Sequence, residues 1–127
     1  MNLYEPEGIR AKAAEHWVGA QAEHASGRFS TAAALAYYAC FQTMLAEHVR
    51  RGWPPERNDQ YSHGLIHRTA RTVLEEIGRS ELIEHLEVIY SARIQAQYTS
   101  IAHSPAEGAT ILRIAREVLE ALGSGQP

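Results

Sequence analysis

The run Phe29-Ser-Thr-Ala-Ala-Ala-Leu-Ala-Tyr-Tyr-Ala-Cys-Phe-Gln-Thr-Met-Leu-Ala46 is the most informative stretch of the chain, because it holds no charged residue over 18 positions. That length is close to the roughly 18–20 residues that a membrane-spanning helix needs. However, the run contains four hydroxyl or amide side chains and two tyrosines, and alanine is its commonest residue. It therefore predicts a helix buried among other helices rather than a membrane span, and we expect no membrane partner.

Helical patterns continue on both sides of this run. The chain has 20 Ala, 14 Glu and 11 Arg, all good helix formers. Apolar residues recur at helical spacing in its third and last segments, and no segment has the alternation typical of a strand. We therefore expect an all-α fold, an antiparallel bundle of four to five helices at about residues 6–26, 30–51, 62–78, 80–101 and 104–122.

Capping signals predict where these helices begin and end. Pro6 suits the first turn of the first helix, and Gly27 suits its C-terminal stop. Ser30 or Thr31 is expected to cap the second helix, which the loop from Gly52 to Pro55 ends. The remaining helices are expected to begin at Ser62, Ser80 and Ser104, the last with Glu107 in a capping box.

Length and composition indicate one small domain. The 127 residues have the size of a single domain, with a core expected over about residues 6–122 and a frayed tail at 123–127. The single cysteine, Cys40, excludes an intrachain disulfide framework and fits a reducing compartment. Because residues 1–8 are polar and lack a secretory signal, we expect a cytoplasmic location.

The charges are unevenly distributed along the chain. The net charge is -3, but residues 50–79 carry six arginines against four acidic residues, a net charge of +2. The rest of the chain has a net charge of -5. A basic region of this kind can meet phosphate, although a solvated face of arginines is the alternative. The arginines of this region are Arg50, Arg51, Arg57, Arg68, Arg71 and Arg79.

Metal and cofactor sites find little support in the sequence. His63 and His67 are four residues apart and share a helix face, but no further ligand pattern accompanies them. Cys40 lies inside the apolar run, where a packed thiol is the default. There is no glycine-rich phosphate loop and no GxSxG motif. We therefore expect neither a metal nor a cofactor.

Two spacings place an arginine near a histidine. Five residues separate Arg57 from His63, and His103 follows the segment that begins at Arg93. An arginine that holds phosphate and a histidine that moves a proton suffice in principle for metal-independent RNA cleavage. These four residues are weak catalytic candidates. Arg93 lies in a mostly apolar helix and needs a partner if it is buried, and an ion pair with a glutamate such as Glu47 or Glu84 is the structural alternative.

Four pieces of the chain carry a family resemblance when taken in order. They are Gly27-Arg28-Phe29, the segment from Ala33 to Phe41, Ser62-His63-Gly64, and Arg93-x-x-Ala96-x-Tyr98. Together they resemble the HEPN domains (higher eukaryote and prokaryote nucleotide-binding), in the branch with YYA-x-F, HS/HG and R-x-x-A-D-Y signatures. The resemblance spans roughly residues 10–122. It implies an all-α bundle, like that of nucleotidyltransferase substrate-binding subunits, that commonly forms homodimers.

The resemblance also implies a function. Many bacterial members are encoded beside a minimal nucleotidyltransferase and act as the toxin half of a toxin–antitoxin pair. Active members are ribonucleases with an R-x4–6-H motif that works across the dimer. Other members lack that motif and bind nucleotide or RNA, or serve as partner subunits.

Three positions depart from the family pattern. Tyr98 stands where the catalytic motif has His, and Gln97 stands where the branch has Asp. Leu35 and Ala36 stand where an Arg usually precedes the tyrosine pair. A phenol with a pKa near ~10 is a poor general base at neutral pH. These departures favour a binding domain over a nuclease.

The sequence therefore predicts a nucleotide- or RNA-binding domain, or a partner subunit of a nucleotidyltransferase, without efficient catalysis. A metal-independent toxin ribonuclease and a purely structural interaction module are the alternatives. The expected protein partners are a second copy of the chain and a minimal nucleotidyltransferase. The expected binding residues are Arg93, Gln97 and Tyr98 in a groove, with positive potential from His63, Arg68 and Arg71.

Overall fold

The computed structural model describes residues 3–123 and is helical throughout. The helices are α1 (Pro6–Ala25), α2 (Phe29–Arg50), α3 (His63–Glu76), α4 (Ile83–Tyr98) and α5 (Pro105–Ala121). Two short 3-10 turns, η1 (Arg57–Asp59) and η2 (Ser80–Leu82), lie in the connections. Within residues 3–123 there is no strand, and the only β-type pairing is an isolated bridge between Glu56 and Gln60. The predicted all-α bundle is confirmed.

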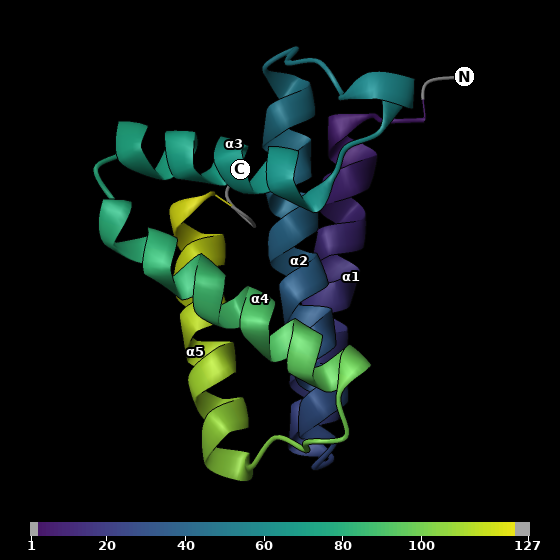
Figure 1. Ribbon diagram of the computed structural model, residues 1–127, viewed down its shortest axis with the longest axis vertical. Coiled ribbons are helices and arrows are strands. Elements are labelled where there is room, and N and C mark those ends of the chain that lie inside the picture. The colour runs from purple at the N-terminus through teal and green to yellow at the C-terminus, as the bar shows by residue number, and fades with distance from the viewer. Residues whose placement is uncertain (1–2, 124–127) are drawn as a thin grey trace.

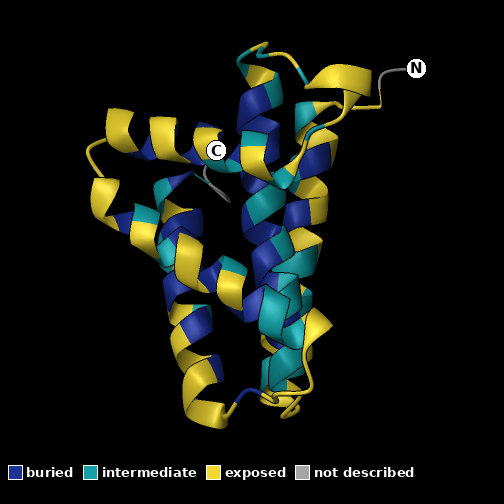
Figure 2. Ribbon diagram, viewed as in Figure 1, coloured by how far each residue is buried: buried dark blue, intermediate teal, exposed yellow. Residues whose placement is uncertain are grey.

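Helix α2 is the centre of the bundle. It packs against α1, α3, α4 and α5. Figure 1 shows α1 and α2 side by side along the length of the molecule, with α4 crossing in front and α3 lying across one end. Buried residues concentrate along α2 and on the neighbouring helices (Figure 2). This arrangement brings the C-terminal half of α4 against the middle of the tyrosine-containing helix.

The uncharged run forms the buried helix that its composition predicted. Six of its alanines are wholly or partly buried, and so are both tyrosines. Cys40 is a packed thiol whose Sγ lies 3.8 Å from the carbonyl oxygen of Ala115, and burial raises its pKa to about 12. No helix among residues 3–123 has the length and apolar character needed to cross a membrane.

Several helix ends follow the predicted caps. Pro6 opens α1, and Gly27 adopts the left-handed backbone (φ 82°) that stops it. The side chain of Ser62 accepts a hydrogen bond from the backbone N–H of Leu65 at 3.1 Å. Ser104 and Glu107 form the complete capping box at the start of α5. Of the predicted frayed tail, residues 124–127 lie outside the described residues.

Three predicted helix ends were wrong. Helix α2 begins at Phe29, and neither Ser30 nor Thr31 caps it. The hydroxyl of Ser30 instead lies 3.1 Å from Nδ1 of His103, a partner 73 positions away along the chain. Helix α4 begins at Ile83 and not at Ser80, because Ser80 belongs to the 3-10 turn η2 and caps no helix. It ends at Tyr98 rather than near Ile101, because Thr99 leaves the helix in extended backbone.

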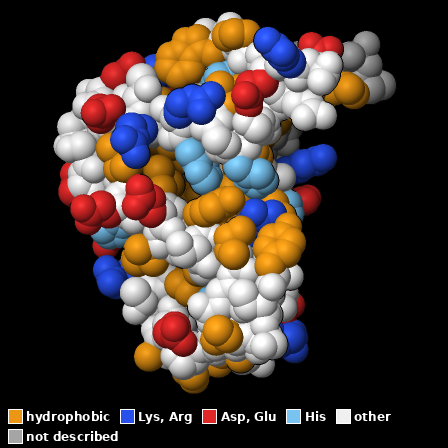
Figure 3. All heavy atoms as spheres, in the orientation of Figure 1, with side chains coloured by type: hydrophobic (Ala, Val, Ile, Leu, Met, Phe, Trp, Pro, Cys, Tyr) orange, Lys and Arg blue, Asp and Glu red, His pale blue; other side chains and the backbone are white. Residues whose placement is uncertain are grey.

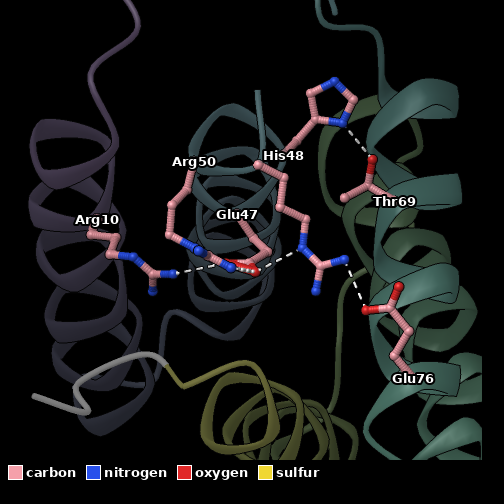
Figure 4. A network of polar contacts seen from close by, with 7 residues as sticks. Arg10, Glu47, His48, Arg50, Thr69 and Glu76 are labelled. Carbon is pink, nitrogen blue, oxygen red and sulfur yellow. Dashed lines mark hydrogen bonds and ion pairs between the residues drawn. The ribbon is translucent and has the colours of Figure 1, made fainter. Parts of the chain in front are cut away.

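A buried carboxylate ties three helices together at one end of α2. Glu47 is 9% exposed and accepts hydrogen bonds from Arg50 at 2.7 and 2.6 Å and from Arg51 at 3.0 Å. Arg10 of α1 lies 3.6 Å from the same carboxylate, and Arg51 also pairs with Glu76 of α3 at 2.8 Å (Figure 4). The hydrogen bonds from Arg50 are the main reason that the pKa of Glu47 falls to about 2.

Candidate functional site

Arg93 is a buried cation on the inner face of α4. Its helical position places it beside Ala92 and one turn beyond Ile89, both buried, and only 7% of Arg93 itself is exposed. Its Nε donates a hydrogen bond to Oε1 of Gln97 at 2.6 Å, one turn further along the helix. Its Nη2 lies 3.3 Å from the hydroxyl of Tyr38 and 3.5 Å from that of Tyr98.

Four tyrosine rings surround this guanidinium and are called here the tyrosine cage. The Cζ atom of Arg93 lies 5.3 to 6.0 Å from each ring centroid, within the range of cation–π attraction. Two of the rings come from α2 and two from α4, so the cage exists only once these helices pack. The cage consists of Tyr37, Tyr38, Tyr90 and Tyr98.

No carboxylate neutralises Arg93 among residues 3–123. Glu47, one of the two partners considered from sequence, is engaged by Arg10, Arg50 and Arg51. Glu84, the other, lies in a groove that Arg93 does not line. The alternative of an internal ion pair at Arg93 is therefore wrong. A buried charge without a counter-ion is costly, and the phenols and rings offset only part of that cost.

One end of the guanidinium reaches the surface. Nη1 of Arg93 makes no hydrogen bond within the described residues, yet it is not among the buried polar atoms that lack a partner. It therefore keeps contact with solvent. Two N–H groups at Nη1 remain available to an anion that enters from that side.

Two histidines from α3 complete the site. The hydroxyl of Tyr37 hydrogen-bonds to Nδ1 of His63 and lies 3.0 Å from Nε2 of His67. A phenol donates one hydrogen bond, so it donates to one ring nitrogen and accepts from an N–H on the other ring. The outer nitrogens of the two neutral imidazoles then present one donor and one acceptor. On the face drawn in Figure 3, histidine side chains gather beside basic and hydrophobic ones.

Burial keeps these histidines neutral at about pH 7. It lowers the pKa of His63, and the positive charge of Arg93 lowers it further. Burial also lowers the pKa of His67, with a smaller contribution from His63. The pKa of the Tyr37 phenol is raised well above its ordinary value of 10.0, chiefly by burial. The guanidinium is thus the group that carries a full positive charge here, and the phenols and imidazoles add neutral hydrogen-bonding groups.

The family match accounts for nearly the whole chain. A family model of the HEPN domain matches residues 7–125. The chain belongs to the HEPN domain family. A search of curated proteins found no match.

The structure brings together some of the predicted site residues of this HEPN domain. Arg93, Gln97 and Tyr98 are in direct contact, and His63 joins them through Tyr37. Arg68 and Arg71 are exposed on α3. Arg68 faces away from the cage, into a hollow formed with Trp53 and its proline neighbours. These placements leave Arg93 as the centre of the candidate site.

Neither predicted arginine–histidine pair forms among residues 3–123. Arg57 belongs to η1 and lines a surface hollow with Glu56, Gln60 and Ser62, whereas His63 points to Tyr37. His103 is buried, with only 7% of it exposed, and its Nδ1 is hydrogen-bonded to the hydroxyl of Ser30. No contact joins His103 to Arg93 in the described chain. The geometry therefore supports neither pair as a catalytic unit.

Other hollows of this HEPN domain have different chemistry. A groove of about 790 Å³ between α4 and α5 is lined by apolar and uncharged polar residues, by His103, and by the carboxylates of Glu84, Glu87 and Glu107. Its carboxylates repel anions. Among residues 3–123 there is no cluster of three or more His, Cys, Asp or Glu able to hold a metal ion.

Sequence reasoning did not assign roles to the rest of the cage. Tyr37 and Tyr38 entered only as a family signature, and Tyr90 was not singled out. His67 shares a helix face with His63, which is the one local signal that it belongs to the same site. The convergence of α2, α3 and α4 on Arg93 depends on tertiary packing, which no local spacing reports.

Proposed function

We propose that this HEPN domain binds nucleotide or RNA by a phosphate at Arg93, without efficient catalysis. The observation that carries the proposal is a cation only 7% exposed whose contacts are all with neutral groups. A phosphate supplies the missing negative charge, and guanidinium binds phosphate oxygens well. The HEPN family is associated with nucleotides and RNA, which agrees with this chemistry.

The identity of Gln97 favours a bound anion, rather than a carboxylate of the chain itself, as the partner of Arg93. In the resembling branch an Asp stands at this position, and its carboxylate would offset the charge of an Arg one turn away. Gln97 occupies Nε of Arg93 by a hydrogen bond of 2.6 Å and adds no charge. The side chain is thus oriented while its positive charge stays available to a ligand.

Tyr98 supplies a platform for a base. It is 67% exposed at the end of α4, and its hydroxyl lies 3.5 Å from Nη2 of Arg93. Bases of single-stranded RNA stack on exposed aromatic rings, a contact worth about 1–3 kcal/mol per base. A phosphate at Arg93 and a base on Tyr98 are therefore compatible with one bound nucleotide.

The test compares binding by folded variants. The probes are 5′-AMP, by calorimetry, and a fluorescein-labelled oligouridine, by anisotropy. Arg93→Met removes the charge but keeps an unbranched side chain, and we expect a loss of at least about tenfold in affinity. Tyr98→Ala changes an exposed residue and should cost about five- to tenfold or more for the oligouridine.

Arg113→Ala is the matched control, because this arginine is exposed on α5 and pairs only with Glu117 in the described chain. Its affinity should equal that of the wild type. Wild-type protein that binds neither probe would overturn the proposal and leave a structural role. So would Arg93→Met protein with a native circular-dichroism spectrum and unchanged affinity for both probes.

For the assembly, we propose a homodimer that pairs with a minimal nucleotidyltransferase in a cytoplasmic toxin–antitoxin type module. The support is the resemblance of the Tyr37-Tyr38-Ala39-x-Phe41 and Arg93 segments to the branch with that association. A small nucleotidyltransferase gene beside this one, and its product co-purifying with this chain, are the expected findings. If light scattering finds a monomer and no such gene lies beside this one, the proposed assembly is contradicted. The proposed phosphate site at Arg93 would not be affected by that result.

A metal-independent ribonuclease is the second candidate function, and the histidine pair favours it. His63 and His67 are neutral at about pH 7 and present one donor and one acceptor beside Arg93. General acid–base catalysis needs such a pair within reach of the phosphate. This function would be established if the wild-type protein cleaves RNA in the presence of EDTA and the His67→Ala variant does not. RNA that stays intact with wild-type protein would leave the domain a binder.

A further inference from the structure

A row of side chains on α3 leads away from the Arg93 site. His63, His67 and Arg71 are spaced four residues apart, so they follow one another along one helix face. The first two contact Tyr37, and Arg71 is exposed one turn beyond them. Histidine and basic side chains lie along this part of the surface in Figure 3. We call His63, His67 and Arg71 the α3 row.

Arg71 carries an unneutralised charge. Half of the arginines in the basic central region are paired with carboxylates: Arg50 and Arg51 with Glu47, and Arg79 with Glu81. Arg71 has no ion pair among residues 3–123, although Glu75 follows it by one turn. The basic character predicted for this region is therefore concentrated at a few positions, of which Arg71 lies in line with the cage.

The α3 row is longer than one phosphate group can span. A helix rises 1.5 Å per residue, so the eight-residue step from His63 to Arg71 covers about 12 Å. One phosphate held at Arg93 cannot also contact Arg71 at the far end of such a row. A neighbouring phosphate of the same strand can contact Arg71, because the distance between successive phosphates of an extended strand is shorter than the α3 row.

We propose that the ligand is single-stranded RNA whose backbone runs from Arg93 along the α3 row to Arg71. This rests on the proposed function, because Arg93 holds the first phosphate. Beyond Arg71, the exposed carboxylate of Glu75 lies one turn further along the helix and ends the favourable path, whereas Glu76 is paired with Arg51. The strand therefore places about two to three phosphates on the protein, and the protein contacts the backbone and one stacked base rather than the sequence.

Arg68 offers a matched comparison on the same helix. It is exposed and, like Arg71, has no ion pair among the described residues, but it faces the hollow beside Trp53. Direct phosphate contact predicts a large effect at Arg71 and a smaller one at Arg68. A diffuse positive potential predicts equal effects, because the two arginines lie on one helix only three residues apart.

The test measures affinity against strand length and salt. Uridine di-, tetra- and hexanucleotides and 5′-AMP are titrated into the wild-type chain, Arg71→Ala and Arg68→Ala at several KCl concentrations. We expect affinity to rise from 5′-AMP to the tetranucleotide in the wild type. Arg71→Ala should remove most of that gain and lower the salt slope by about 0.7, and it should weaken 5′-AMP binding far less than tetranucleotide binding.

The possible results separate the RNA path from the proposed function. A tetranucleotide that binds no more tightly than 5′-AMP, or equal losses in Arg71→Ala and Arg68→Ala, would overturn the RNA path. In either case, 5′-AMP binding that depends on Arg93 would leave the proposed function standing. Absence of binding by every probe would overturn both.

Discussion

Replacing Glu47 by Gln should make the stability of the domain much less sensitive to acid. The pKa of this carboxyl lies at about 2 in the folded chain, against an ordinary value of 4.5. A depressed pKa means that the folded state holds the carboxylate more tightly than the unfolded state does. The stabilisation is therefore fully present above about pH 4.5 and is lost as the pH falls toward 2.

The size of the effect follows from the shift. At 1.36 kcal/mol per pKa unit, the depression corresponds to about 3 kcal/mol at neutral pH. Arg50 and Arg10 are partly exposed, so water screens part of the attraction, and we expect about 2–3 kcal/mol. The side chain of Glu47 itself is only 11% exposed, which keeps the value well above that of a surface ion pair.

Urea unfolding followed by circular dichroism measures this difference at several pH values. Glu47→Gln should lower the free energy of unfolding by about 2–3 kcal/mol at neutral pH, and the two proteins should converge as the pH approaches about 2–3. Glu120→Gln is the control, because Glu120 is exposed and has no ion pair in the described chain, and it should change stability by less than about 0.5 kcal/mol. Equal losses in the two variants, or a difference that does not shrink on acidification, would refute the reasoning.

Two further predictions concern histidines. By NMR titration, His63 and His67 should both titrate below their ordinary pKa of 6.5, and Arg93→Met should raise the pKa of His63 more than that of His67, because Arg93 acts directly only on the first; equal changes would contradict the geometry. Ser30→Ala should cost about 1–3 kcal/mol because it removes the partner of buried Nδ1 of His103, and that cost should largely disappear in a His103→Leu background. A cost that persists there would mean that the hydrogen bond donated by the backbone N–H of residue 103 to Oγ of Ser30, at 3.4 Å, carries the stabilisation instead of the imidazole.

Local signals predicted most helix ends, and the exceptions have physical causes. Ser62 and Ser104 cap their own helices, so their partners lie three residues away and can be found by spacing. Ser30 looked like the same kind of residue, but its hydroxyl is used by His103 across the fold. Tertiary contacts of this kind override a local preference and leave no mark in the neighbouring sequence.

The candidate site was predictable only along one helix. Gln97 lies one turn beyond Arg93, and their contact follows from helical spacing. The tyrosines of α2 and the histidines of α3 reach the same guanidinium only because α2 packs against both helices. Whether Arg93 meets a carboxylate or a phenol depends on that packing, so an internal ion pair with Glu47 was an equally reasonable expectation.

The net charge of -3 conceals two different uses of arginine. At one end of α2, arginines and glutamates neutralise each other and hold helices together. At the Arg93 site the positive charge has no such partner in the described chain, while the glutamates Glu84, Glu87 and Glu107 line the α4–α5 groove. Charges further apart than about 8–10 Å are largely screened at physiological salt, so a bound phosphate responds to the local arrangement and not to the sum. An acidic chain can therefore bind an anionic strand, provided that its carboxylates are already paired or directed to another face.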